Sequence, residues 1–564
     1  MSNKKILKIL NLIRKHLELH GENDFKIRTY QNTIQRLERL HEPLEEKDES
    51  SLQDIEGIGK SMAATIREIV VSGSSLTLQQ LESETPDGIK EIMRFRGIGP
   101  KRLHQLWEEF NVTDKASLKE LLESGQLASV KGFGPKTIES TAKVVDFIFE
   151  SEGKILYADA EKIGNLIINK LVEQLPEARF SFVGKLRRKW EVIDNIEILA
   201  DQPIPKLVPV LEKISWLKMD KKKSGPFSWK GRSAQELDIE VTVYSSPVDK
   251  FYNNLILKTG SPEHLNTTLS EKSLKESVNQ QNWPDEQACY EAAGLSYCEP
   301  EIREGDWEVA MTVEHKLPEI VELKDLKGVI HNHSVYSDGQ NTLREMAYAC
   351  IAMGYDYLGI SDHSKAASFY ANGMFEETVA KQQSEIDQLN KELDPFKIFK
   401  GIEADILADG ALDYDEKTLS TFDFVVASIH SGLNMDKQRA TERLITAIAN
   451  PYTTMLGHMT GRLLLERQAY PVDHEAVINA CGEFGVIIEI NAHPSRLDID
   501  WRWIRKALDK GIILSINPDA HEIAGFDDMR YGVHIGRKGG LTKEQTFNAW
   551  SLDKVESYFS ERRK

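Results

Sequence analysis

The sequence predicts a multidomain protein with a helical N-terminal region, an α+β middle region and a C-terminal α/β barrel of seven parallel strands. The first observation is length, because 564 residues are several times a typical domain of about 100–150 residues. The second is a set of three similar glycine turns that lie between helical patterns near the N-terminus. The third is a series of seven short apolar runs that alternate with amphipathic helical patterns from residue 326 onward.

Composition and charge limit the classes of function. The chain is 40% hydrophobic and 28% charged, with a formal net charge of −18, so it is not expected to coat nucleic acid by bulk charge. Local contacts through backbone amides and a few basic side chains stay open. No apolar run is long enough to span a membrane, and the N-terminus lacks the apolar core of a signal peptide. We therefore expect a cytoplasmic, monomeric protein without a membrane partner.

Changes of pattern along the chain predict its domain boundaries. The predicted segments are a helical domain with the first glycine turn (1–80), a second helical domain with two such turns (81–150), a strand-rich domain (151–245), a helix-and-loop domain (246–312), a charged linker (313–325) and the barrel (326–564).

The three glycine turns are "DIEGIGKSMAATI" (54–66), "RFRGIGPKRLHQL" (94–106) and "SVKGFGPKTIEST" (129–141). Two glycines allow a tight turn, and the backbone N–H groups that begin the next helix form an anion site. The turns resemble tandem helix-hairpin-helix motifs, which hold DNA backbones without reading sequence. The alternative is three connections that serve only packing. The predicted DNA-binding residues are Gly57, Gly59, Lys60, Gly97, Gly99, Lys101, Gly132, Gly134 and Lys136.

Residues 151–245 carry strand-like alternation in "ARFSFVG" (178–184), "NIEILA" (195–200) and "ELDIEVTVY" (236–244). Alternation of this kind places Glu197, Asp238 and Glu240 on one side of paired strands.

Ligand-type side chains follow the apolar runs of the barrel. The carboxyl ends of parallel barrel strands meet at one rim, so these groups converge there. They are His331, His333, Asp338, His363, Glu403, His430, His458, Asp519 and His521. All-nitrogen and oxygen ligation favours Zn, Mn or Fe, and crowding so many titratable groups without cations would be costly. A chance gathering is the alternative interpretation.

The motifs "HNHSVYSDG", "GISDHS", "GIEADI", "ASIHSG", "GHMTGRLL" and "INPDAH" resemble those of the PHP (polymerase and histidinol phosphatase) domain. That resemblance implies a distorted seven-stranded barrel with up to three metal ions. It implies one ion on His331, His333, Glu403 and Asp519, a second on Glu403, His430 and His458, and a third on Asp338, His363 and His521. The stretches "TGRLLLERQAY" (460–470) and 496–521 are similar to the PHP domain fused to bacterial family X DNA polymerases.

Clustered divalent cations lower the pKa of water and stabilise a leaving 3′ oxygen during in-line attack on phosphorus. The expected catalytic residues are His331, His333, Glu403 and Asp519. Arg462 is expected to bind the phosphate, with an exposed surface arginine as the alternative.

The middle of the chain resembles the palm and thumb of family X polymerases, whose palm carries Gly-Ser, a basic pair and Asp-x-Asp. In "GKLRRKWEVIDNIEIL" (184–199), Gly184 and Arg187–Arg188 match, but Lys185 replaces the serine. Asn195 and Glu197 replace the two aspartates, and Asp238 is interpreted as the third. Asparagine is neutral and glutamate places its carboxylate one methylene further out, so an octahedral Mg²⁺ site should fail. The polymerase core is predicted to be inactive.

The sequence therefore favours a DNA repair protein whose barrel is a Mn-, Zn- or Fe-dependent 3′→5′ exonuclease acting on gapped or 3′-ended DNA. Abasic-site cleavage is a secondary activity that the resemblance also suggests. The alternatives are an active polymerase with an altered metal site formed by Glu197 and Asp238, a small-molecule phosphatase related to histidinol phosphatase, and a non-catalytic DNA scaffold.

Overall fold

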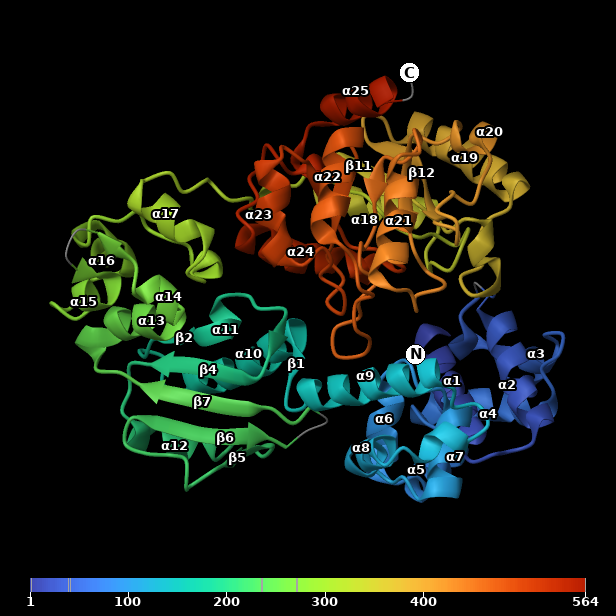
Figure 1. Cartoon of the computed structure of the whole chain (residues 1–564), viewed down its shortest axis with the longest axis horizontal. Helices are drawn as coiled ribbons and strands as arrows, with labels where there is room; N and C mark the ends of the chain where they lie inside the picture. Colours follow the sequence, from blue (N-terminus) through green and yellow to red (C-terminus); the bar gives the residue numbers. More distant parts are fainter. Residues whose placement is uncertain (2, 39, 41, 235–236, 270–271, 563–564) are drawn as a thin grey trace. The chain divides into compact units, whose positions relative to one another are not determined.

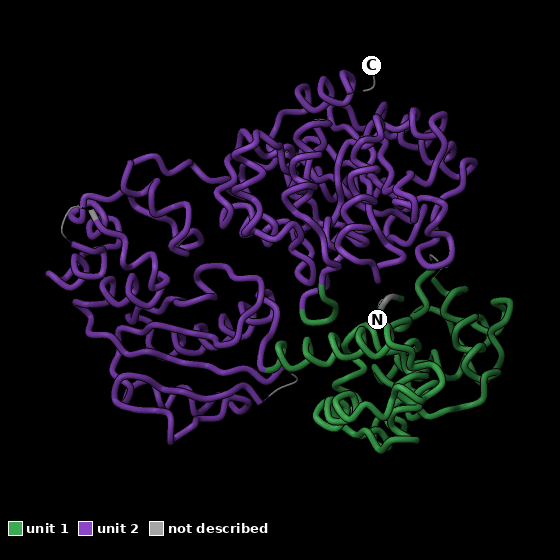
Figure 2. Tube along the Cα trace, in the orientation of Figure 1, with its two compact units in different colours: residues 1–152, 465–468 green, residues 153–464, 469–564 purple. Residues whose placement is uncertain are grey.

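The computed structural model describes residues 1–564 except 2, 39, 41, 235–236, 270–271 and 563–564. The chain divides into two compact units (Figure 2). The first unit comprises Met1–Glu152 and Leu465–Gln468, and the second comprises Gly153–Leu464 and Ala469–Lys564. The predicted fold class, with helices first, a mixed sheet next and a parallel barrel last, is confirmed (Figure 1).

The first unit is helical. Its helices are α1 (Asn3–Leu19), α2 (Asp24–Leu37), α3 (Glu49–Gln53), α4 (Lys60–Ser72), α5 (Leu76–Glu84), α6 (Asp87–Arg94), α7 (Pro100–Phe110), α8 (Lys115–Glu123) and α9 (Pro135–Ser151). Apolar stripes on these helices form two cores, one around Leu10, Ile34 and Ile66 and one around Leu103 and Leu118. The loop residues between the paired glycines, Ile58, Ile98 and Phe133, are also buried and fix each turn to its core.

The second unit begins with a five-stranded mixed sheet of order β2-β4-β7-β6-β5. Its strands are β2 (Phe180–Phe182), β4 (Asn195–Ala200), β5 (Leu217–Met219), β6 (Ser228–Ser233) and β7 (Glu240–Ser245). Helices α10 (Tyr157–Gln174) and α12 (Ile204–Leu211) cover one face, where Ile196, Trp229 and Val241 are buried. Because side chains alternate along a strand, Asn195 and Glu197 lie on the opposite face.

A short helical region follows the sheet. Its helices are α13 (Phe251–Thr259), α14 (Pro262–Leu265), α15 (Leu274–Val278), α16 (Glu286–Ala292) and α17 (Trp307–Val313). Its core contains Ile256, Tyr290 and Trp283. Arg303 is fully buried and pairs with Glu286 at 2.6 Å between Nη1 and Oε1.

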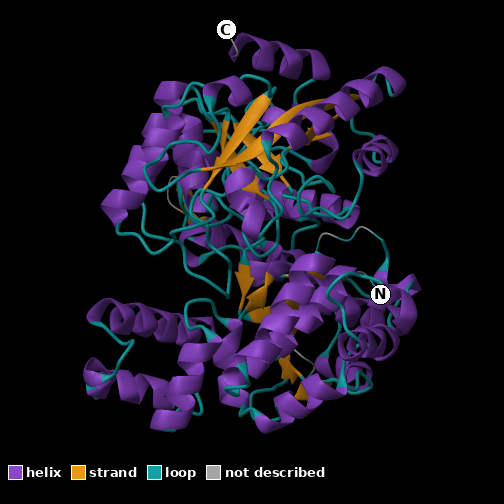
Figure 3. Cartoon of the chain, turned by 90° about the vertical axis from the view of Figure 1, so that its right-hand side faces the viewer, coloured by secondary structure: helices purple, strands orange, loops and turns teal. Residues whose placement is uncertain are grey.

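The barrel is a seven-stranded parallel sheet whose neighbouring strands follow one another in sequence order. Figure 3 draws the strands in orange and the helices around them in purple. Its strands are β10 (Gly328–Val329), β11 (Tyr357–Ile360), β12 (Lys397–Asp405), β13 (Phe424–Ser428), β14 (Met455–Leu456), β15 (Ile487–Asn491) and β16 (Leu514–Asn517). A parallel bridge between Asn332 and Ala520 joins the loops that follow the first and last strands. This bridge brings the two ends of the sheet together at the rim that the sequence marks.

Helices surround the barrel. They are α18 (Leu343–Ala352), α19 (Glu376–Glu392), α21 (Lys437–Ile448), α22 (His474–Phe484), α23 (Trp501–Asp509), α24 (Met529–Lys538) and α25 (Leu552–Arg562). Aromatic residues of α25 and the segment before it, including Phe547 and Phe559, pack against Phe399 and Phe424 of the strands. None of the helices in the described part of the chain has both the length and the apolar character needed to cross a bilayer.

Candidate functional site

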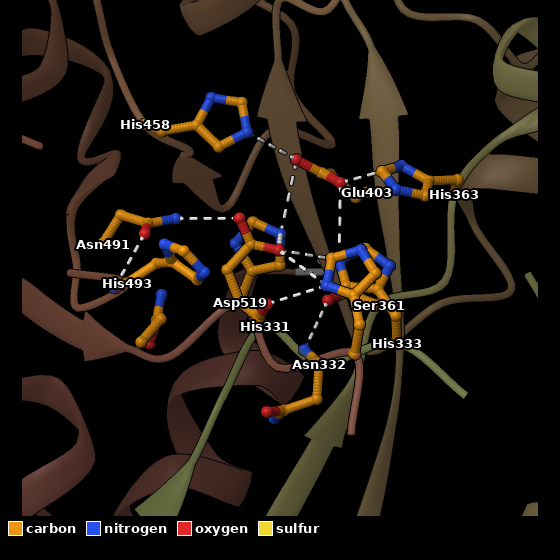
Figure 4. Close-up of polar contacts among 12 residues, drawn as sticks. His331, Asn332, His333, Ser361, His363, Glu403, His458, Asn491, His493 and Asp519 are labelled. Atoms are coloured by element: carbon orange, nitrogen blue, oxygen red, sulfur yellow. Dashed lines mark hydrogen bonds and ion pairs between the residues drawn. The ribbon is translucent and has the colours of Figure 1, made fainter. Parts of the chain in front are cut away.

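All nine ligand-type residues predicted from the sequence meet at one rim of the barrel (Figure 4 labels His331, His333, His363, Glu403, His458 and Asp519). His331 and His333 follow β10, His363 follows β11, Glu403 lies within β12, His430 follows β13, His458 follows β14, and Asp519 and His521 follow β16. Asp338 reaches the rim from the loop after His333 and lies 3.4 Å from His521 Nε2. The site is therefore built by the carboxyl ends of six strands.

Glu403 occupies the centre of the cluster and is buried. Its Oε1 lies 3.1 Å from Nε2 of both His430 and His458 and 3.3 Å from Nε2 of His331. Its Oε2 lies 2.9 Å from Nδ1 of His363. Two ligands of one ion stand roughly 3.0–3.5 Å apart when each bond is about 2.0–2.2 Å long. The spacing around Glu403 is that of ligands sharing cations.

Many of these atoms have no hydrogen-bond partner. Within the described part of the chain, this holds for His331 Nε2, His333 Nδ1, His363 Nδ1, both Glu403 carboxylate oxygens and both His458 ring nitrogens. Glu403 and its imidazole neighbours are at contact distance, yet their orientation does not form hydrogen bonds. Buried polar atoms left unpaired are costly, so a bound cation accounts for this arrangement better than direct pairing. The residues fit a multinuclear metal site.

Three groups of side chains could each hold an ion. They are His333, Asp338, His363 and His521; His331, His333 and Asp519; and His363, Glu403 and His430. They overlap the three predicted ligand sets but are divided differently, because His333 and His363 each stand between two groups. The two rings stack with centroids 4.3 Å apart.

Two carboxylates that the sequence reasoning missed orient the imidazoles. Glu489 on β15 accepts a 2.5 Å hydrogen bond from His331 Nδ1 and a 2.7 Å bond from the backbone N–H of His458. Asp405 accepts from His430 Nδ1 and from the Tyr370 hydroxyl. Each carboxylate leaves Nε2 of its histidine directed at Glu403, as partners of metal-bound histidines do. The available signal was an acidic residue inside the apolar run "GVIIEIN".

Replacing Glu489 by glutamine tests this role. We expect metal affinity to fall by about 10- to 100-fold, as for other groups that orient a metal ligand. The isosteric amide keeps the volume but can present its NH₂ group to His331 and disturb the tautomer. Metal titration by calorimetry measures the effect, with Glu385→Gln on α19 as the matched control. Equal metal affinity in the two variants would contradict the role.

The crowded groups of the cluster shift the pKa values of its histidines in opposite directions. Burial opposes the charge of His331, but Glu489, Glu403 and Asp519 raise its pKa well above the usual value. Burial together with His521 and His363 lowers the pKa of His333 to about 3. His331 and Asp519 also have φ values of 64° and 53°, in the left-handed region that few non-glycine residues adopt. Such strain is typical of functional sites.

The prediction that Arg462 binds phosphate is not supported by its position. Its guanidinium donates to the Arg496 carbonyl at 2.9 Å, to Asp500 at 2.7 Å and to the Leu497 carbonyl. These bonds use its donors inside the protein and hold the loop after β15. Arg496 is nearer to the cluster, with its Nε 3.6 Å from the Asp519 carboxylate.

Strand register decides which residues of the palm-like sheet lie beside Asn195 and Glu197. Asn195 donates to the Thr242 hydroxyl at 3.1 Å, and Thr242 is the register partner of Glu197. Asp238 precedes β7 and accepts a 2.7 Å bond from Arg232. The register of β4 against β7 pairs Glu197 with Thr242 and Asn195 with Glu240. The interpretation of Asp238 as the third palm carboxylate stays a prediction.

The exposed face of this sheet carries a cavity of about 930 Å³ that is rich in positive charge. Thr242 and three acidic residues, Asp220, Asp238 and Glu240, line it. So do six basic side chains: Lys218, Lys221, Lys222, Lys223, Lys230 and Arg232. Lys223 and Arg232 approach Glu240 to 3.1 and 3.4 Å. The acidic groups here are neutralised by side-chain cations.

The basic pair of the palm motif is also engaged. Arg187 donates to Glu286 through two bonds, of 3.0 and 2.5 Å. Arg188 donates to Glu304 at 3.0 Å and to the Thr259 carbonyl at 2.6 Å. Both guanidiniums pair with carboxylates of the following helical region.

The three glycine turns share one geometry in the first unit. The first glycine of each pair, Gly57, Gly97 or Gly132, has φ of 83°, 127° or 95°. The second glycine is the N-cap of α4, α7 or α9, and no side chain caps these three helices. A Cβ on Gly59, Gly99 or Gly134 would meet nothing within 4 Å, and Lys60, Lys101 and Lys136 are exposed. Helices α2, α3, α5 and α8, in contrast, have Asn, Asp or Ser side-chain caps.

Sequence comparisons extend these observations. A helix-hairpin-helix domain model matches residues 1–75, a SAM-like helix-hairpin-helix tandem model matches 49–111, and a PHP domain model matches 330–519. The DNA polymerase/3′-5′ exonuclease PolX of Bacillus subtilis is 34% identical over 579 residues, covering 99% of this chain and 99% of that protein. A probable phosphatase of Caldanaerobacter subterraneus is 28% identical over 254 residues, 42% of this chain and 91% of that protein. A probable phosphatase of Thermoanaerobacter sp. is 26% identical over 247 residues, 42% of this chain and 94% of that protein.

Proposed function

Because the chain belongs to the PolX family of DNA polymerase/3′-5′ exonucleases, we propose that its barrel hydrolyses DNA phosphodiesters from the 3′ end. The observation that carries the proposal is the buried, unpaired set of ligand atoms around Glu403. We infer that His331, His333, Asp338, His363, Glu403, His430, His458, Asp519 and His521 hold up to three Mn, Zn or Fe ions. Divalent ions at such a site lower the pKa of water and neutralise phosphodiester charge.

The protein's own residues define how a substrate is held. On the buried side of the metal cluster, Glu489 and Asp405 orient the rings of His331 and His430. The side chains of Asp338 and His521 are 32% and 28% exposed and form the open side of the cluster. We expect a phosphodiester to enter beside these two residues, and Arg496 near Asp519 is the cation placed to pair with it.

The test is digestion of 5′-labelled single-stranded and gapped DNA across a panel of Mn²⁺, Zn²⁺, Fe²⁺ and Mg²⁺, after removal of bound metal with a chelator. We expect no cleavage in the chelated protein and progressive shortening from the 3′ end when a suitable ion is restored. Metal-independent cleavage, or no cleavage with any of the ions, would contradict the proposal.

We propose that DNA is held by the three glycine turns, including the third, which lies beyond the matched family models at 129–141. The uncapped N–H groups of α4, α7 and α9 and the lysine beside each form a phosphate site. In each turn the buried residue between the glycines fixes the loop, so the backbone donors are preorganised.

Replacing Lys60, Lys101 or Lys136 by alanine should weaken binding to all DNA sequences equally. The slope of log K against log salt is negative, and each loss of one phosphate contact should reduce its magnitude by about 0.9 for duplex DNA. Fluorescence anisotropy over a salt series measures the slope, and Lys143→Ala on α9 is the exposed control. If Lys136→Ala leaves the slope of the wild type unchanged, the third turn does not bind DNA.

We also propose that the palm-like sheet does not synthesise DNA. Two-metal nucleotidyl transfer needs carboxylates that share two Mg²⁺ ions, and Asn195 and Thr242 supply none. Glu197 accepts a 2.8 Å bond from the Tyr244 hydroxyl, and Glu240, the register partner of Asn195, pairs with Lys223 and Arg232. The neighbouring cavity is lined by six basic side chains, whose charge opposes the binding of divalent cations.

A second candidate function is hydrolysis of small phosphate monoesters, because two of the shorter relatives are named probable phosphatases. Activity on a phosphomonoester with none on oligonucleotides would favour it over the exonuclease.

A further inference from the structure

One loop at the metal rim carries exposed aromatic side chains. The loop spans residues 365–375, between His363 and α19, and contains Phe369, Tyr370 and Phe375. The Phe369 side chain is the most exposed of the large hydrophobic side chains described, at 89%, while Tyr370 and Phe375 are 51% and 56% exposed. Single exposed hydrophobic residues are common, but three within seven positions beside a candidate active site are not explained by packing. This stretch is called the aromatic loop below.

The aromatic loop is fixed to the metal cluster at three points. The Met374 N–H donates to the His363 carbonyl at 2.8 Å. The Asn372 side chain donates to the carbonyl of Ser337, the residue before Asp338, at 3.1 Å. The Tyr370 hydroxyl donates to Asp405 at 2.8 Å. Two anchors therefore end at, or next to, a candidate ligand, and the third ends at the carboxylate that orients His430.

These anchors hold the backbone beside Phe369 at the rim of the metal cluster. Phe369 directly precedes Tyr370, whose ring centroid lies 6.2 Å from that of His430. A ring on an anchored backbone loses less conformational freedom when a flat apolar partner stacks on it than a ring on an unanchored segment does. The substrate group within reach of a phosphodiester at this site is the nucleobase of the terminal nucleotide.

We propose that Phe369 is a stacking platform for the 3′-terminal nucleobase, so the rim grips an unpaired DNA end by its base as well as its phosphate. This inference rests on the proposed exonuclease function and adds a base subsite to it. Base–aromatic stacking is tolerant of sequence because every base has a flat face, so the subsite selects unpaired ends without reading their sequence.

The test compares two 3′ ends that differ only in the base. One oligonucleotide ends in an ordinary nucleotide and the other ends in an abasic sugar. With the wild type, kcat/KM should be higher for the base-bearing end. Phe369→Ala should lower that value by about 5- to 150-fold, the equivalent of about 1–3 kcal/mol per stacked base, and leave the abasic end unaffected. Phe369→Trp should retain the preference, because indole also stacks.

Phe227→Ala is the matched control, since this phenylalanine is 79% exposed and precedes β6 in the palm-like sheet. It should keep the preference of the wild type. If Phe369→Ala retains the same preference for the base-bearing end, the stacking proposal is overturned while the exonuclease stands.

A binding measurement separates the stacking proposal from the exonuclease proposal. An oligonucleotide with 2-aminopurine at its 3′ terminus reports stacking through fluorescence quenching, and Glu403→Gln serves as the non-cleaving background. Quenching that disappears with Phe369→Ala supports the subsite even if no hydrolysis is ever detected. Equal fluorescence with and without Phe369 overturns it.

Discussion

Glu403→Gln is expected to abolish DNA hydrolysis while leaving the fold intact. Glu403 is the only carboxylate within 3.3 Å of four imidazoles among the described residues, namely those of His331, His363, His430 and His458. The amide keeps the side-chain size but removes the charge that offsets neighbouring cations and replaces one ligand oxygen by an NH₂ group. Bound metal contributes several kcal/mol to such reactions, so the rate should fall on the order of 10³-fold or more.

Two measurements accompany this variant. Elemental analysis of the purified protein should show fewer bound ions than in the wild type, and thermal unfolding in chelator should match the wild type within a few degrees. Glu392→Gln, on the exposed end of α19, is the control for the substitution itself. Wild-type hydrolysis by Glu403→Gln would show that the cluster is not the catalytic site.

The second prediction with a large expected effect concerns DNA synthesis by the palm-like sheet. In primer extension with all four deoxynucleotides and Mg²⁺ or Mn²⁺, we expect no templated product. The Glu403→Gln background should be used so that degradation cannot hide extension. Asn195 and Thr242 form a hydrogen bond with each other, so neither is available as a metal ligand. Arg187 and Arg188 pair with Glu286 and Glu304, so neither is available to bind a triphosphate.

Binding gives an independent test of the inactive palm. Electron paramagnetic resonance should detect no Mn²⁺ held by the palm-like sheet, and Glu197→Ala should leave Mn²⁺ binding unchanged. Robust templated extension that Glu197→Ala removes would establish an active polymerase with an altered metal site and refute this part of the proposal.

The ligand residues could be predicted because a parallel barrel places the ends of its strands at one rim. His363 and His430 come directly after apolar runs that are predicted to be parallel strands. Their convergence therefore follows from the barrel topology. Glu489 could not be found in this way, because it lies within a buried strand and its role depends on the neighbouring Nδ1 atom of His331. A sequence pattern shows which strand end carries a histidine, but not which group orients the ring.

Arg462 and Asp238 illustrate two other limits. The direction of the Arg462 guanidinium is decided by Asp500, a residue 38 positions further along the chain. The third palm position depends on the register of two parallel strands, which pairs Asn195 with Glu240 and Glu197 with Thr242. Neither long-range packing nor strand register is encoded in a short motif, and a shift of a few residues changes which side chains meet.

The central claim is that metal ions at the barrel rim cut DNA from its 3′ end, and the polarity of digestion tests it most directly. One oligonucleotide is labelled at the 5′ end in one reaction and at the 3′ end in another, each with the metal-restored wild type. We predict a ladder that shortens nucleotide by nucleotide from the 5′-labelled strand, and immediate release of a labelled mononucleotide from the 3′-labelled strand. Stepwise loss of the 5′ label, or two intact strands with every ion, would contradict the account.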